Sequence, residues 1–92
     1  MTSLIDKEIC LIDAGITSLT QVKVQFNTES VNLHCNLLKD IQHIDAMRYL
    51  KRLDLSSNQI KFMKGLDGMV LLESLNLACN EISVVQGLRD LR

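Results

Sequence analysis

Apolar and polar residues alternate in three short stretches of the chain, and all three follow one template. Each stretch has an apolar residue, a polar residue, a leucine, two further residues and an asparagine, and a third apolar residue follows two positions later. The stretches begin at Val31, Leu53 and Leu75, so the template returns every 22 residues. Alternation of this kind places both apolar side chains on one side of a short strand. The fixed period indicates a repeat architecture in which each unit stacks on the next.

The residues after each asparagine also align when the chain is divided into rows of 22. The apolar columns are Leu38, Ile60 and Ile82; Ile41, Met63 and Val85; Ile44, Leu66 and Leu88; and Met47, Met69 and Leu91. A spacing of three residues predicts 3₁₀ or short helical turns, and only the segment 68–72 could form a short true helix. The pattern therefore predicts an α/β solenoid, with short parallel β-strands on its concave face and these turns on its convex face.

A weaker row precedes the first clear repeat. Ile9 aligns with Val31, but Ala14 stands where the asparagine is expected. We interpret residues 1–27 as a degenerate first or capping repeat, followed by repeats at 28–49, 50–71 and 72–92, the last of them incomplete. A competing interpretation is local: apolar residues alternate with polar ones over 22–26, which is typical of a strand.

The repeated asparagine is predicted to be structural. The chain must turn sharply after each strand, which leaves backbone N–H and C=O groups without partners in the sheet. An asparagine side chain carries an acceptor and a donor on a short arm, so it can serve both kinds of group. We expect Asn36, Asn58 and Asn80 to form a ladder that joins consecutive turns.

Composition narrows the range of functions. The chain has 92 residues and a net charge of −1, without a basic cluster, and its only aromatic residues are two phenylalanines and one tyrosine. These features disfavour nucleic-acid binding, which needs clustered positive charge or stacking platforms. The longest strongly apolar run, 69–72, is far shorter than the roughly 18 residues of a membrane span. Three cysteines without a CxxC pair favour a reducing compartment.

No arrangement of residues predicts catalysis or metal binding. His34 and His43 fall on different sides of the expected repeat, and we expect no enzyme activity, no cofactor and no metal. Cys35 and Cys79 share a column two repeats apart, which places their strands about 9–10 Å from each other. This separation exceeds the usual Cα limit of a disulfide, about 7 Å. We expect both to be small buried side chains that pack beside the asparagines.

Binding of other proteins is the expected activity, and the solvent-facing positions of the strands are the candidate surface. This surface is polar and nearly neutral, and it has no aromatic anchor of the kind that dominates many interfaces. An ordinary solvated sheet face explains it equally well. The candidate residues are Ser30, Asn32, His34, Arg52, Asp54, Ser56, Ser74, Asn76 and Ala78.

The stretches "LDLSSNQI…GL" and "LNLACNEI…GL" resemble the 22-residue, SDS22-like class of leucine-rich repeats. This class occurs in a phosphatase-regulatory protein and in many centrosomal and ciliary proteins. The resemblance implies a non-catalytic module of a cytoplasmic scaffold at the centrosome, centriole or cilium base. The alternative that it implies is a regulatory subunit that docks on a protein phosphatase.

The sequence stops within a repeat, at "QGLRDLR". We therefore expect a fragment of a longer protein, whose continuation into a coiled coil would favour the scaffold. We also expect the apolar residues of the last repeat to be partly open to water, because no further repeat covers them.

Overall fold

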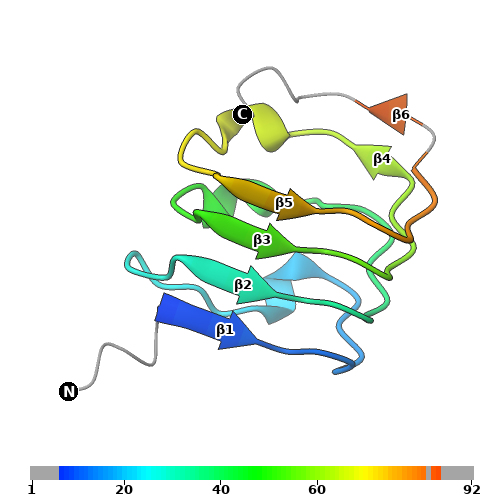
Figure 1. The fold of residues 1–92 in the computed structure, drawn as a ribbon, viewed down its shortest axis with the longest axis horizontal. Coiled ribbons are helices and arrows are strands. Elements are labelled where there is room, and N and C mark those ends of the chain that lie inside the picture. Colours follow the sequence, from blue (N-terminus) through cyan, green and yellow to red (C-terminus); the bar gives the residue numbers. More distant parts are fainter. Residues whose placement is uncertain (1–6, 83, 86–92) are drawn as a thin grey trace.

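The computed structural model describes residues 7–82, 84 and 85. Short strands and 3₁₀ helices alternate along this part of the chain (Figure 1). In chain order they are β1 (Glu8–Cys10), η2 (Leu19–Gln21), β2 (Ser30–Asn32), η3 (Ile44–Met47), β3 (Arg52–Asp54), β4 (Phe62–Met63), η4 (Leu66–Gly68), β5 (Ser74–Asn76) and β6 (Val84–Val85). No α-helix forms in the described residues, so segment 68–72 lacks the true helix that we considered.

The main sheet has four parallel strands in the order β1-β2-β3-β5. The register pairs Ile9 with Val31, Val31 with Leu53, and Leu53 with Leu75. The columns of the sequence are thus columns of the sheet, and the alignment of Ile9 with Val31 is confirmed. Figure 1 shows the four strands lying side by side, each one step along the stack from the last.

Two segments depart from the expectations. Residues 22–26 do not form a strand, because the chain passes from η2 into a turn at Phe26. Conversely, β4 and β6 pair in parallel to form a second, two-stranded sheet, where we expected helical turns. Met63 points into the core from β4 and is 1% exposed, so an extended backbone still delivers the apolar column to the interior.

The core is one continuous cluster of the repeated apolar columns. Leu33, Leu38, Leu55, Ile60 and Leu66 have no exposed surface at all. Each such side chain contributes roughly 1.5–3 kcal/mol by leaving water. In the row of β5, Leu75, Leu77 and Ile82 are only partly buried, as expected. Val85 and Leu88 carried the same expectation, but their side chains lie outside the described part.

The asparagine side chains bridge consecutive rows. Asn58 accepts the N–H of Leu38 from the row before it, at 3.0 Å. Its amide donates to the carbonyls of Leu33 and Leu55, both at 3.0 Å, and to that of Ser56. Asn80 repeats the arrangement one row later, and Asn36 does so one row earlier. Asn36 there accepts the N–H groups of Ala14 and Ile16.

The residue before each asparagine, like Asp13 before Ala14 in the first repeat, adopts a left-handed backbone. The φ angles are 54° at Asp13, 59° at Cys35, 56° at Ser57 and 59° at Cys79. Cys35 and Cys79 are therefore exposed, and the expectation that they are buried is wrong. The reason is geometric: the chain turns inward at the following asparagine, and the side chain at the corner stays outside. A left-handed backbone also forms at His43 and Gly65, which precede η3 and η4.

We predict that Asn58→Ala destabilises the fold more than Asn32→Ala does. Asn58 is buried and joins several backbone groups, and each one left unpaired costs about 1–3 kcal/mol. Asn32→Ala removes the same side-chain amide, but from a half-buried position. Thermal melts of the two variants and the parent measure the difference. A larger loss in Asn32→Ala would show that the asparagine column does not stabilise the turns.

A second pair of variants tests the core. Leu55→Ala removes a fully buried side chain and should cost about 2–5 kcal/mol. Leu77→Ala makes the same change one row later, where the leucine is only partly buried, and should cost clearly less. Equal losses in urea denaturation would contradict this gradient of burial.

Candidate protein-binding face on the strands

The candidate residues lie on β2, β3, β5 and the turns that follow them. We call this surface the strand face. Strand register places Ser30, Arg52 and Ser74 in a first row and Asn32, Asp54 and Asn76 in a second. His34, Ser56 and Ala78 make a third row, where the chain leaves the strands. The first two rows line a shallow depression, and Figure 1 shows no described element in front of it.

Charges gather at the first row. The guanidinium of Arg52 lies 3.6 Å from the carboxylate of Glu29, and the Lys51 ammonium lies 3.9 Å from the same group. The Arg52 side chain is 46% exposed, so water screens this ion pair and it adds little stability. Arg52 can therefore exchange Glu29 for an acceptor on another molecule at small cost.

The second row has a local structural role that the sequence analysis missed. The side-chain oxygens of Asn32, Asp54 and Asn76 each accept the backbone N–H two residues later, at 2.9–3.0 Å. These bonds hold the turn at the end of each strand, as short polar side chains commonly do. The signal was present in the sequence, because the column holds only asparagine or aspartate in the three clear repeats. Only part of each side chain remains available to a partner.

The third row corrects one expectation. Ser56 is 5% exposed and does not face solvent. Its hydroxyl donates to Oδ1 of Asp54 and lies 2.7 Å from Nδ1 of the half-buried His34. Strand pairing brings His34 of one repeat beside Ser56 of the next. The sequence of either repeat alone does not reveal this contact. Ala78 is exposed, as expected.

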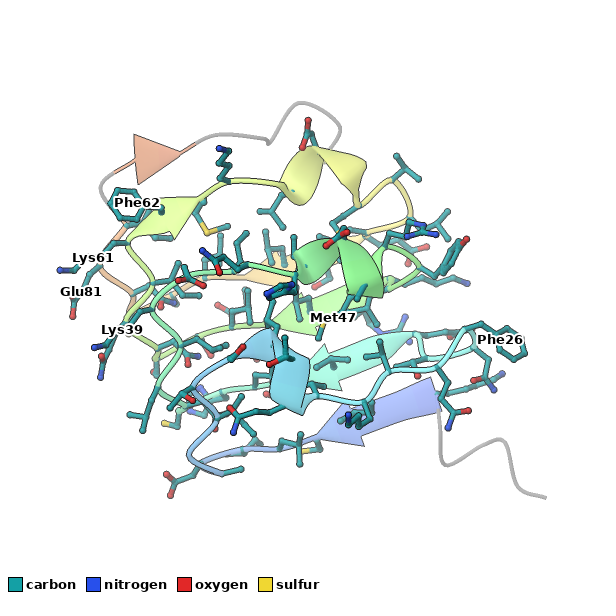
Figure 2. The ribbon with its side chains drawn as sticks, turned by 180° about the vertical axis from the view of Figure 1, so that it is seen from behind. Phe26, Lys39, Met47, Lys61, Phe62 and Glu81 are labelled. Atoms are coloured by element: carbon teal, nitrogen blue, oxygen red, sulfur yellow. The ribbon has the colours of Figure 1, made fainter. Side chains whose placement is uncertain are left out.

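Several apolar side chains are exposed near the start of the strands, and we did not predict them from the sequence. Phe26 is 86% exposed, and Tyr49, Val70 and Leu71 are also exposed in the loops that precede β2, β3 and β5. Phe26 and Val70 share one column of the repeat, and Tyr49 and Leu71 share the next, which is the signal that would have found them. The Arg48 guanidinium lies 5.1 Å from the centre of the Tyr49 ring. Figure 2 shows Phe26 projecting at this end of the strands.

The described residues contain no group of three or more histidine, cysteine or acidic side chains that could hold a metal ion. All three cysteines are free thiols. His43 lines a groove with Phe62 and Lys64, away from the strand face that includes His34. Among the helices that the structure describes, none is long and apolar enough to cross a membrane.

Comparison with known proteins gives two kinds of match. The leucine rich repeat family matches residues 26–82. The chain is also similar to the human leucine-rich repeat and coiled-coil domain-containing protein 1, with 42% identity over 47 residues, which is 51% of the chain. The Xenopus laevis protein of the same name is 43% identical over 48 residues, or 52% of the chain.

These matches cover the chain and the relatives very differently. The aligned part is 5% of the length of either relative, so most of each relative has no counterpart here. The family match, in contrast, spans more than half of this chain and includes the strands β2, β3 and β5. The chain therefore belongs to the leucine-rich repeat family.

Proposed function

We propose that the chain is a protein-interaction module that binds its partner on the strand face. The observation that carries this proposal is the open sheet face itself: two rows of polar side chains without a described element over them. In a stacked repeat fold the strands form the concave side, and this is the surface that such folds commonly offer to partners. Family membership supports a binding role over catalysis.

The chemistry of the face indicates the kind of partner. The first row offers two serine hydroxyls and the re-pairable cation of Arg52, and the second row offers the remaining amide and carboxylate atoms. A partner with a carboxylate opposite Arg52 would gain a charge-assisted hydrogen bond. The apolar side chains at Phe26, Tyr49 and Leu71 can add contact area at the edge.

We further propose that the module works in a scaffold of the centrosome or cilium base. Support comes from the similarity of the chain to a leucine-rich repeat and coiled-coil domain-containing protein, and from the resemblance of "VNLHCN" and "LDLSSNQI" to repeats of that kind. A cytoplasmic location and a coiled coil elsewhere in the full protein are parts of the same proposal. Docking on a protein phosphatase is the alternative that the class of repeat also implies.

Alanine variants of the first row should leave the fold intact. Ser30→Ala, Arg52→Ala and Ser74→Ala each remove side chains from the outer side of the strands, where substitutions change stability by about 0.5 kcal/mol or less. Ser56→Ala should cost more, because Ser56 is buried and hydrogen-bonded. Urea melts of the four variants check this order. A first-row loss as large as that of Ser56→Ala would show that the row is structural.

A charge-reversal pair tests the binding surface. Arg52→Glu reverses one charge on the strand face, whereas Lys61→Glu makes a comparable change at an exposed position elsewhere (Figure 2). In proximity labelling in ciliated cells, the parent and Lys61→Glu should enrich the same centrosomal proteins, and Arg52→Glu should lose most of them. Equal labelling by both variants would contradict a role for the strand face. Recovery of a phosphatase catalytic subunit by the parent would instead favour the alternative.

A further inference from the structure

Four side chains form a continuous hydrogen-bonded chain where β2 and β3 end. The Cys35 sulfur lies 3.3 Å from Nε2 of His34, and Nδ1 of His34 lies 2.7 Å from the Ser56 hydroxyl. That hydroxyl donates to Oδ1 of Asp54. We call this arrangement the Cys35 relay. It joins a thiol on the surface to a carboxylate on the neighbouring strand.

The hydrogen bonds fix the direction of the relay. A carboxylate accepts hydrogen bonds, so the single proton of the Ser56 hydroxyl points to Asp54. The hydroxyl oxygen must then accept from His34, which places the ring proton on Nδ1. Nε2 of the neutral ring is consequently the acceptor that faces Cys35. The imidazole is thus oriented to take the proton of the thiol.

We propose that Cys35 is a reactive thiol that exchanges with small-molecule disulfides. His34 acts as its general base, and Ser56 and Asp54 are positioning residues. A nucleophile within reach of a base, which a third group orients in turn, is the usual arrangement that activates a thiol. Exposure of Cys35 gives a disulfide access to the sulfur.

The exchange balances without any other reactant. His34 Nε2 takes the thiol proton, and the Cys35 sulfur attacks one sulfur of the disulfide. The disulfide bond breaks as the new sulfur–sulfur bond forms, and the leaving thiolate recovers the proton from His34. Cys35 is oxidised to a mixed disulfide, and the disulfide supplies the oxidising equivalents. His34, Ser56 and Asp54 belong to the strand face, but the exchange needs no partner bound there.

The chain contains a natural control for this proposal. Cys79 occupies the same column as Cys35, has the same φ of 59°, and is also exposed. The residue before it is Ala78 in place of His34. Both thiols thus have a left-handed backbone and an exposed position, and the residue before them differs, His34 in one case and Ala78 in the other.

The first experiment uses the unmodified chain. A limiting amount of Ellman's reagent, an aromatic disulfide, is added at neutral pH, and peptide mass spectrometry follows each cysteine over time. Cys35 should react at least about tenfold faster than Cys79, because a positioned general base accelerates proton transfer by this much or more. Equal rates at Cys35 and Cys79 would overturn the proposal.

The second experiment removes the base. Cys10→Ser leaves only the two thiols to be compared. In that background, His34→Ala places an alanine before Cys35, just as Ala78 stands before Cys79. The rate at Cys35 should fall to within about twofold of the rate at Cys79, since general-base assistance is lost. An unchanged ratio of the two rates would exclude His34 as the base. Because Cys79 is measured in the same molecule, a general loss of structure would raise both rates and is recognised at once.

The third experiment tests the positioning role of Ser56. Ser56→Ala keeps the imidazole but removes its hydrogen-bond partner, and Ser56→Thr restores a hydroxyl. The rate at Cys35 should drop several-fold in the first variant and recover in the second, while the rate at Cys79 stays constant. If both variants behave alike, Ser56 does not orient His34 and that part of the relay is wrong.

Discussion

The rest of the structure depends on the hydrogen bonds that the side-chain amide of the repeated asparagine makes. A parallel sheet of three-residue strands has little backbone pairing of its own, and each strand ends at a sharp turn. Asn58 ties its own turn to the carbonyl of Leu33 and the N–H of Leu38, both in the preceding row. The constant spacing of 22 residues returns each asparagine to the same place in its row.

Sequence periodicity predicted the features that every row repeats. The strands, their register and the buried columns follow from apolar alternation and from the repeat length, as the pairing of Val31 with Leu53 illustrates. The exposure of Cys35 and Cys79 was missed because a left-handed corner within each repeat turns them outward. Two other errors concern contacts between rows. Burial of Ser56 depends on the ring of His34, and pairing of β4 with β6 depends on two segments 22 residues apart. A pattern within one row carries no information about either contact.

The strand face combines two duties that sequence alone does not separate. Asn32, Asp54 and Asn76 were candidates for partner contacts, but one oxygen of each already holds a turn. A partner therefore meets a surface whose polar atoms are held in place before binding. Fixed polar groups lose little conformational freedom in a complex, which favours selectivity over adaptability.

The left-handed corner before each asparagine, and before Ala14 in the first repeat, places few demands on its side chain. Aspartate, cysteine and serine all occupy it, at Asp13, Cys35, Ser57 and Cys79, with almost the same φ angle. Neighbouring corners are separated by roughly one strand spacing, about 4.8 Å. The stack can thus hold chosen functional groups on its surface at regular intervals without disturbing its interior. Substitutions at this column alone could therefore introduce a line of thiols, carboxylates or metal ligands.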